Sequence, residues 1–297
     1  MSQPALAILL TLGAGLLYTL GYAIAKIIAG TLDPVQITFL RSAFVLAGAA
    51  AYALRLSDPA GAVRRILNPV RARDQRLAAA MLIFSTTLAV LGYSLVPVTE
   101  ASALGFTAPI ILVLLGALVL REHVTPRRWV ALALGFAGML VVVRPGGDLF
   151  TWAAFVPVTA ALTYALYQVM TRRIRGVANE WDATLQGALA GVVLLGPAMP
   201  FLWRTPDLRG LLLVAVYAAV QTAALLCIAG AVRRAEVSGL APWNYSRIVF
   251  ALAFDAILFA RVPGLWALLG CALIAAGGLV LAWPRAVPVR PGSRQRP

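Results

Sequence analysis

Ten apolar runs of about twenty residues follow one another along this chain of 297 residues. A helix of roughly 20 apolar residues crosses the hydrocarbon core of a bilayer, so each run is a candidate membrane span. Breakers such as Asp33-Pro34, Pro97 and Pro145-Gly146-Gly147 separate the runs. The runs lie at about 4–29, 34–55, 75–95, 98–120, 126–144, 149–172, 181–203, 208–232, 236–259 and 263–283.

The composition agrees with a chain whose solvent is lipid. Hydrophobic residues make up 61% of the sequence and charged residues 12%, whereas a soluble domain carries about 25% charged residues. The net charge of +14 could suggest nucleic acid as a partner, but the arginines gather in the short gaps between apolar runs. That distribution indicates membrane topology instead. The sequence therefore predicts an all-α integral membrane protein with ten transmembrane helices.

The basic residues also predict the orientation of the spans. With the N-terminus inside, cytoplasmic segments hold eighteen Arg residues, and the opposite side holds only Arg144, Arg204, Arg209 and Arg261. The positive-inside rule then places both termini in the cytoplasm.

The two halves of the chain resemble each other. LLYTLGYAIAKIIAG (16–30) aligns with LTYALYQVMTRRIRG (162–176), LVPVTEAS (95–102) with AVRRAEVS (231–238), and residues 131–138 with 270–277. A repeat of five spans is odd in number, so the second copy must have the opposite topology, as in many transporters. We expect two inverted five-helix repeats, 1–145 and 146–284, around a central cavity, followed by a disordered cytoplasmic tail, 285–297.

Several kinds of chemistry have no support in the sequence. The only histidine, His123, stands near the end of an apolar run, and neither a zinc-protease motif nor a Walker loop is present. Cys227 and Cys271 lie inside apolar runs, where packing explains them. We therefore expect no catalytic residues, no metal and no cofactor.

Four charged residues interrupt the apolar runs: Lys26, Arg41, Arg247 and Asp255. A charge at the centre of a bilayer costs about 2.5–3.5 kcal/mol on insertion scales, so such residues face a partner or a polar cavity. One interpretation is that these charges pair and fix helix packing, since Asp255 follows Arg247 by about two turns. The other is a cationic lining that holds an anionic group of a substrate, with Lys26, Arg41 and Arg247 as candidates.

Aromatic and amide side chains inside the spans are a second signal. They can be ordinary packing residues, or they can line a site for a flat or amphipathic solute. The candidates are Tyr18, Tyr22, Tyr164, Tyr167, Gln168, Tyr217, Gln221, Trp243, Asn244 and Tyr245.

Glu100 and Glu236 occupy matching positions in the repeats, at the starts of the fourth and ninth spans. A carboxylate at a helix N-terminus is stabilised by the macrodipole. Capping is one role for them, and gating or proton coupling is the other. Asp255 is a further candidate for coupling or gating.

Two segments resemble the EamA branch of the drug/metabolite transporter superfamily. They are EASALGFTAPIILVLLGALVLREHVT (100–125), with Pro109 and the closing Glu122, and SGLAPWNYSRIVFALAFDAILFARVP (238–263). The chain departs from the family pattern at Arg261, where a glutamate is usual, and at Asp255, where a small residue is usual.

This resemblance implies a helical basket around a central cavity, without a prosthetic group. It suggests a secondary transporter in a bacterial inner membrane that works as a monomer on a small molecule. The aromatic and arginine candidates favour export of amino acids, including aromatic ones, as in exporters of the YddG type. One alternative is import of a vitamin, nucleoside or cofactor-like metabolite. Another is a non-transporting membrane scaffold or lipid-handling enzyme.

Overall fold

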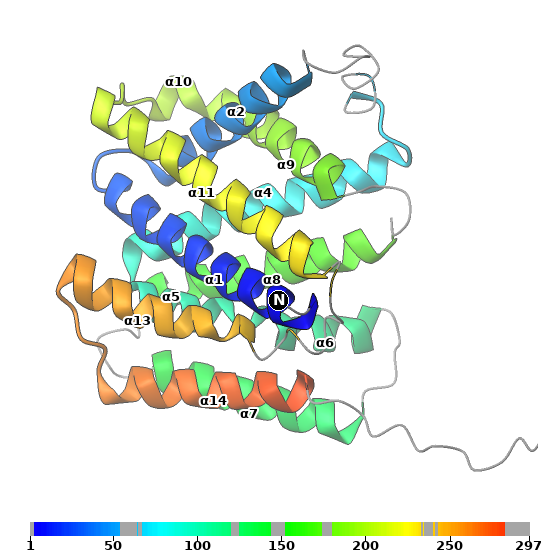
Figure 1. The fold of residues 1–297 in the computed structure, drawn as a ribbon, viewed down its shortest axis with the longest axis vertical. Helices are drawn as coiled ribbons and strands as arrows, with labels where there is room; N and C mark the ends of the chain where they lie inside the picture. The colour runs from blue at the N-terminus through cyan, green and yellow to red at the C-terminus, as the bar shows by residue number, and fades with distance from the viewer. Residues whose placement is uncertain are drawn as a thin grey trace, which may run out of the picture.

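The computed structural model describes residues 3–53, 64, 67–119, 125–143, 152–173, 180–232, 234, 240 and 243–282. All the regular elements in these residues are helices (Figure 1). In the first half they are α1 Gln3–Ile28, α2 Pro34–Ala53, α4 Ala72–Leu95, α5 Val98–Gly105, α6 Ala108–Val119 and α7 Pro126–Val143. In the second half they are α8 Trp152–Arg173, α9 Glu180–Leu195, the 3-10 turn η1 Gly196–Ala198, α10 Met199–Leu202, α11 Leu208–Val232, α13 Ser246–Phe259 and α14 Leu265–Ala282.

These helices follow the ten apolar runs. Six described helices are long and apolar enough to cross a membrane, and Val98–Leu112, Trp129–Val142 and Leu265–Val280 form shorter apolar helices. Large apolar side chains such as Phe84 and Phe136 face outward, which suits a lipid solvent. The prediction of an all-α membrane fold is confirmed.

Two predicted spans are each built from more than one helix. The fourth consists of α5 and α6, and the seventh of α9, η1 and α10. The short gap predicted before the fourth span is real, because α4 ends at Leu95 and α5 begins at Val98.

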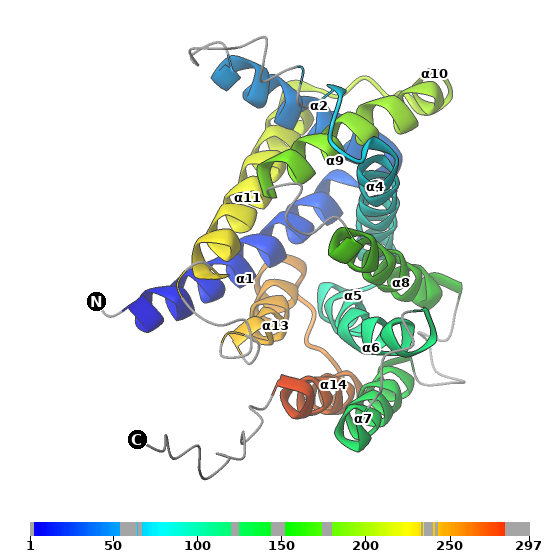
Figure 2. The ribbon, with the colours of Figure 1, turned by 90° about the vertical axis from the view of Figure 1, so that its right-hand side faces the viewer.

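The most extensive contacts between helices occur in pairs. Helix α1 packs along α11, and α4 packs along α8 (Figure 2). In the predicted repeat, α1 corresponds to α8 and α4 corresponds to α11. Exchanging the halves therefore converts the α1–α11 contact into the α4–α8 contact. Helices α2 and α9, and likewise α7 and α14, are corresponding spans that contact each other directly. Under this correspondence, exchange of the halves maps each of these contacts onto another contact of the set or onto itself. The predicted boundary at 145 and the tail 285–297 lie outside the described residues.

Glycines bring α7 and α14 together backbone to backbone. A Cβ on Gly138 would lie 2.8 Å from the Gly270 carbonyl oxygen, and a Cβ on Gly277 would lie 2.8 Å from that of Ala131. Small residues permit such close packing in membranes. The sequence alignment equates Ala131 with Gly270 and Gly138 with Gly277, so the two contacts are copies of each other under exchange of the halves.

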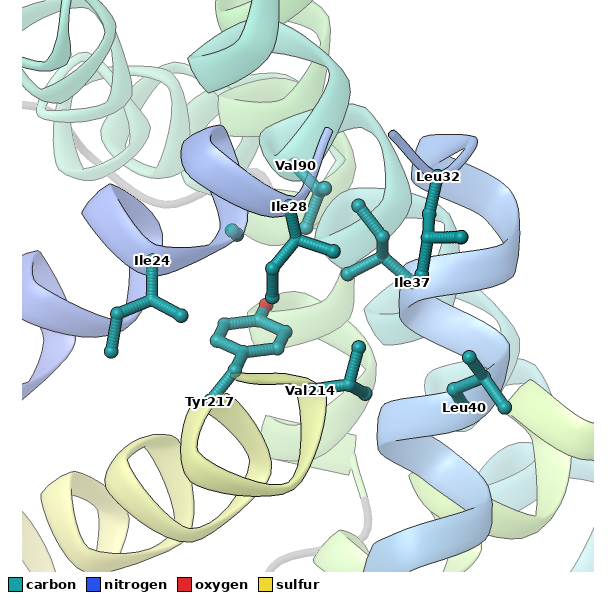
Figure 3. Packing of buried hydrophobic residues seen from close by; sticks show 9 residues of the cluster. Ile24, Ile28, Leu32, Ile37, Leu40, Val90, Val214 and Tyr217 are labelled. Atoms are coloured by element: carbon teal, nitrogen blue, oxygen red, sulfur yellow. The ribbon is translucent and has the colours of Figure 1, made fainter. Parts of the chain in front are cut away.

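An apolar cluster joins α1, α2, α4 and α11. Its members include Ile28 of α1, Ile37 of α2, Val90 of α4 and Tyr217 of α11. Figure 3 shows the Tyr217 side chain extending from α11 toward Ile28. Tyr217 is 0% exposed. The cluster fixes α11 against α1 and thereby positions the polar residues on the neighbouring turns of both helices.

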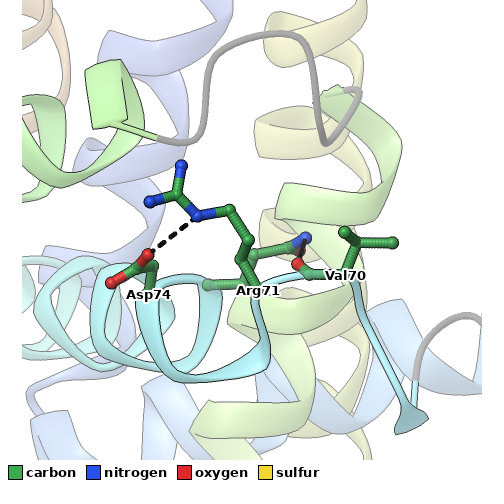
Figure 4. A network of polar contacts seen from close by, with 4 residues as sticks. Val70, Arg71 and Asp74 are labelled. Atoms are coloured by element: carbon green, nitrogen blue, oxygen red, sulfur yellow. Dashed lines mark hydrogen bonds and ion pairs between the residues drawn. The ribbon is translucent and has the colours of Figure 1, made fainter.

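Polar contacts organise the start of α4 (Figure 4). Arg71, which has a positive φ of 55°, lies 3.2 Å from the Asp74 carboxylate, and Gln75 donates to the Val70 carbonyl over 2.7 Å. Both charged side chains of the ion pair are partly exposed. Such a pair contributes about 0–1 kcal/mol to stability. Asp74 is therefore a suitable exposed control for experiments on buried carboxylates.

We predict that Gly138→Ala destabilises the protein by about 1–3 kcal/mol, since overpacking against backbone atoms forces α7 and α14 apart. Gly48→Ala is the matched control, because a Cβ at Gly48 meets nothing within 4 Å and alanine is the better helix former. Thermal unfolding in detergent measures both. Equal losses of stability in the two variants would contradict the backbone contact.

Candidate functional site

The fourth span is broken between α5 and α6. Phe106 and Thr107 separate the two helices, and Pro109 follows in the first turn of α6. Proline has no N–H to donate. The Thr107 hydroxyl donates to the Leu104 carbonyl over 2.6 Å, which satisfies one of the carbonyls at the end of α5. The break presents the Phe106 ring to α13.

Arg247 lies at the matching part of the ninth span, one residue into α13. A turn at Tyr245 precedes the helix, and the Ile248 amide donates to the Tyr245 carbonyl over 3.0 Å. The Tyr245 ring stacks on Phe106 with centroids 5.0 Å apart. The two interrupted spans therefore meet through these aromatic rings.

Aromatic faces surround the Arg247 guanidinium. Its central carbon is 5.2 Å from the centroid of the Tyr18 ring and 5.4 Å from that of Phe106. A cation–π contact is worth about 2 kcal/mol when desolvated. Gly15 of α1 permits the approach, because a Cβ there would lie 3.1 Å from Arg247 Cγ. Arg247 is thus held between α1, α5 and α13.

No carboxylate neutralises Arg247 within the part of the chain that the structure describes. The Arg247 Nε atom is buried and has no hydrogen-bond partner there, and the only ion pair found in that part is Arg71–Asp74. The interpretation that Arg247 and Asp255 pair is therefore wrong. Eight residues of helix separate them by about 12 Å along the axis, at about 1.5 Å per residue.

Asp255 instead caps α5. Its Oδ1 accepts a hydrogen bond from the Val98 amide over 3.0 Å, and its Oδ2 accepts one from the Thr99 amide over 2.6 Å. These amides belong to the first turn of α5, which has no partner of its own for them. Asp255 is completely buried. Both of its oxygens are engaged in a structural contact, and the predicted role in coupling or gating gains no support from it.

Lys26 caps the facing helix end. Its Nζ donates to the carbonyls of Tyr93 and Val96 at the end of α4 and lies 5.5 Å from the centroid of the Phe259 ring. A cation at a helix C-terminus also complements the helix dipole. Two donors of this candidate substrate ligand are thus occupied by backbone carbonyls.

Tyrosines from three helices gather beside Arg247. Tyr22 of α1 stacks on Tyr93 of α4 with centroids 4.2 Å apart, and Tyr164 and Tyr167 of α8 lie 5.8 Å apart. Tyr164 is 41% exposed, although Tyr22 and Arg247 on other helices lie within electrostatic reach of its hydroxyl. Tyr164 is therefore a partly exposed tyrosine within electrostatic reach of groups on α1 and α13.

Arg41 of α2 forms a second cationic group near the tyrosines. Its guanidinium carbon is 5.9 Å from the centroid of the Tyr217 ring. Arg41 Nε, Tyr217 Oη and Gln221 Oε1 are buried without hydrogen-bond partners in the described residues. Tyr18 is within electrostatic reach of both Arg41 and Arg247. The polar groups of the two arginine clusters therefore flank the same part of α1.

The structure does not bring every candidate into this arrangement. No described contact joins Gln168, Trp243 or Asn244 to either arginine, and Trp243 is 42% exposed. Glu236, together with Glu122, lies outside the described residues. Glu100 is buried at the third position of α5, and no described contact joins it to either arginine.

Phe106 and Tyr93 belong to the site but were not among the sequence candidates. Phe106 had a usable signal, since it stands just before the Ala108-Pro109 break. Tyr93 is buried, and its hydroxyl lies 3.1 Å from Ser102 Oγ. Its contact with Tyr22 depends on how α4 packs on α1, which the sequence pattern does not contain.

The fold and this pattern of broken spans are those of a membrane carrier, and comparison with known proteins identifies the family. Residues 5–144 and 151–283 match the EamA-like transporter family. The chain belongs to that family, within the drug/metabolite transporter superfamily. It is a multi-pass membrane transporter of a small molecule.

Named relatives include an uptake transporter and a transporter whose name states no direction. The chain is 24% identical over 194 residues to an S-adenosylmethionine uptake transporter of Rickettsia bellii, covering 65% of this chain and 67% of the relative. It is 30% identical over 206 residues to a riboflavin transporter of Rhizobium johnstonii, covering 65% and 64%. Protein RarD of Streptomyces exfoliatus is 27% identical over 231 residues, covering 75% and 71%. These matches thus span about two thirds of each relative's length.

One solved crystal structure supports the fold. It superposes with a TM-score of 0.62 at 21% sequence identity and covers 93% of this chain and 96% of the other. At this identity the likeness bears on the fold alone.

Removing the cap on α5 tests the role of Asp255. Asp255→Ala leaves two amides without acceptors, and we expect it to cost about 1–3 kcal/mol, with faster hydrogen exchange in residues 98–101. Asp255→Asn keeps one acceptor oxygen and should lose less. Asp74→Ala is the exposed control, with a change of no more than about 1 kcal/mol. Unchanged exchange at α5 in Asp255→Ala would contradict the cap.

Two tyrosines of the candidate site should respond differently to truncation. Tyr217→Ala removes a ring from a filled cluster and should cost about 3–5 kcal/mol of stability. Tyr164→Ala removes a ring that is 41% exposed, so we expect a small loss of stability and a large loss of transport. Thermal unfolding and uptake are measured on the same preparations. A large stability loss in Tyr164→Ala would make it a packing residue.

Proposed function

We propose that this protein imports a cofactor-like metabolite with a flat heteroaromatic ring system across a bacterial inner membrane. The observation that carries the proposal is the Arg247 guanidinium, which lies between the Tyr18 and Phe106 rings without a carboxylate partner in the described residues. The names of the riboflavin and S-adenosylmethionine transporters among its relatives favour uptake of such compounds. Amino-acid export, the first prediction from the sequence, has no such support.

The tyrosines suit the ring system of the substrate. Aromatic faces attract other flat π-systems in offset stacks, and Tyr164 has accessible ring surface close to Arg247. An arginine beside these rings can donate to carbonyl or carboxylate oxygens at the edge of a bound ring. Arg41, Tyr217 and Gln221 offer donors and an acceptor for a second polar group.

The charge of the site narrows the choice among candidate substrates. Arg41 and Arg247 are cationic and have no carboxylate within ion-pair distance in the described part of the chain. A free amino acid needs an acceptor for its ammonium group, and S-adenosylmethionine also carries positive charge. A neutral or anionic ring compound avoids this repulsion. Riboflavin is therefore the first substrate to test.

In this proposal the two inverted five-helix repeats provide the conformational change of transport. The contacts α1–α11 and α4–α8 correspond to each other when the halves are exchanged, and inverted repeats commonly alternate between two conformations around a central site. The repeats are 1–145 and 146–284, both termini face the cytoplasm, and a monomer encloses the site within the lipid bilayer.

The experiment is counterflow in proteoliposomes. Vesicles preloaded with unlabelled riboflavin should accumulate labelled riboflavin, and preloading with phenylalanine, threonine or S-adenosylmethionine should not drive this accumulation. Accumulation of labelled phenylalanine or threonine, without riboflavin counterflow, would favour amino-acid export. No accumulation of any of these compounds by folded protein would overturn the proposed substrate class.

Replacement of Arg247 gives the sharpest variant. Arg247→Gln loses a charge-assisted hydrogen bond worth about 1.5–3 kcal/mol, and we expect riboflavin affinity to fall at least about tenfold. Arg247→Lys keeps the charge but not the planar donor fork, so it should recover only part of the affinity. Arg234→Gln is the matched control, since Arg234 is exposed and donates to Gly230. Wild-type affinity in Arg247→Gln would remove Arg247 from the site.

A further inference from the structure

Glu100 is a buried carboxylate that the substrate site does not use. It occupies the third position of α5 and is 6% exposed. Its Oε2 atom is buried without a hydrogen-bond partner among the described residues. A buried carboxylate oxygen without a donor is costly when the group is charged, because no hydrogen bond compensates that oxygen for the water it has lost.

The charged groups around Glu100 come from several elements. Lys26 of α1, Asp255 of α13 and Arg261, which follows α13, all lie within electrostatic reach of its carboxyl group. The Cys271 thiol of α14 is also within electrostatic reach of the Glu100 carboxyl group. Arg261 is exposed, so water screens it. Apart from Arg261, the set therefore contains two buried carboxylates, Glu100 and Asp255, and the part-buried ammonium group of Lys26.

Lys26 forms no ion pair with Glu100 in the described structure. Lys26 donates to the carbonyls of Tyr93 and Val96, and Asp255 accepts from the amides of Val98 and Thr99. With Glu100 ionised, the set carries an excess negative charge. With Glu100 protonated, Lys26 and Asp255 balance each other. The net charge of Glu100, Asp255 and Lys26 is therefore zero only when Glu100 carries a proton.

A metal cation is a poorer way to neutralise this set. The nearby carbonyl oxygens at the end of α4 already accept from Lys26, whose ammonium group would repel a second cation. The described residues also contain no group of three or more metal-ligating side chains. A proton needs only the free carboxylate oxygen.

We propose that Glu100 is the proton-binding site that couples substrate import to proton movement; the coupling rests on the proposed function. Glu100 lies six residues before Phe106 on the fourth span, and Asp255 lies eight residues after Arg247 on α13. The two elements that carry Phe106 and Arg247 are therefore joined, through the Asp255 cap, beside Glu100.

The coupling step needs only a proton. When Glu100 loses its proton, the carboxylate formed repels Asp255 and weakens the hold of Asp255 on the start of α5. Helices α5 and α13 then separate at this end, and the Phe106–Arg247 contact near the other end of α5 is altered. Substrate binding between these residues and proton binding at Glu100 thus favour the same closed arrangement.

The first test needs no substrate. Dicyclohexylcarbodiimide reacts with protonated carboxyl groups in apolar surroundings, and peptide mass spectrometry locates the product. We expect Glu100 in the purified full chain to be modified at pH 6 and several-fold less at pH 9, with Asp74 unmodified as the exposed control. Absence of modification at Glu100 in folded protein at both pH values would overturn the proton site.

The second test measures coupling in proteoliposomes with the membrane potential clamped at zero. An acidic exterior should accelerate wild-type riboflavin uptake several-fold. Glu100→Gln should lose this acceleration and keep riboflavin counterflow, whereas Glu100→Asp and Asp74→Asn should keep both. An unchanged acceleration in Glu100→Gln, or none in the wild type, would overturn the coupling.

The two proposals fail in different ways. If the wild type carries no riboflavin, the proposed substrate is wrong, and the carbodiimide reaction alone decides whether Glu100 binds a proton. If riboflavin is carried without any response to the pH gradient, the transporter stands and the coupling role of Glu100 is wrong. Equal thermal stability of Glu100→Gln and the wild type excludes misfolding as the cause.

Discussion

The short junction between α4 and α5 is the point on which the arrangement of the first half depends. Helix α4 ends at Leu95 and α5 begins at Val98, so free carbonyls and free amides meet within a few residues around Pro97. In an apolar medium each unsatisfied group costs several kcal/mol. Lys26 supplies donors to the carbonyls, and Asp255 supplies acceptors to the amides. One junction thereby fixes α1 and α13 against α4 and α5.

The four charged residues within the spans make two kinds of contact, and only two of them contact this junction. Lys26 and Asp255 complement opposite helix ends, which stabilises each charge through the helix dipoles. Arg41 and Arg247 have aromatic rings beside them and no carboxylate partner in the described residues. An arginine in such surroundings is stabilised by cation–π contacts rather than by an ion pair. The two pairs of charges therefore differ in what they touch: Lys26 and Asp255 contact helix ends, whereas Arg41 and Arg247 contact aromatic rings.

The sequence predicted the helices well because lipid solvent imposes a simple rule on apolar length. It also selected Arg247 and Tyr18 as candidates, because a charge or a hydroxyl within an apolar run is visible without a structure, and the fold brings these two side chains into contact. The role of Asp255 could not be predicted from its spacing to Arg247. A shared helix face places two residues in line, but two turns keep them about 12 Å apart. The true partners of Asp255 lie 157 and 156 residues away in the chain.

Contacts between distant helices also explain why the sequence candidates did not include Tyr93 and Phe106. Tyr93 and Phe106 look like ordinary apolar-run aromatics until helix packing brings them to Tyr22 and Arg247. Gly15 and Gly21 let Arg247 and Gln221 approach α1, since added Cβ atoms would meet these side chains at 3.1 and 3.0 Å. A glycine inside an apolar run signals close packing, but it does not identify which helix approaches.

The energies of the junction suit a carrier that must change shape. A helix cap contributes about 0.5–2 kcal/mol, and a charge at a helix end up to about 2 kcal/mol. Opening the contacts made by Lys26 and Asp255 therefore costs a few kcal/mol, which is less than unfolding either helix. Shifting a two-state equilibrium from 1:99 to 99:1 takes about 5.5 kcal/mol of differential binding. The caps at this junction are therefore worth less than such a shift requires, so they can order the junction without preventing a change of shape.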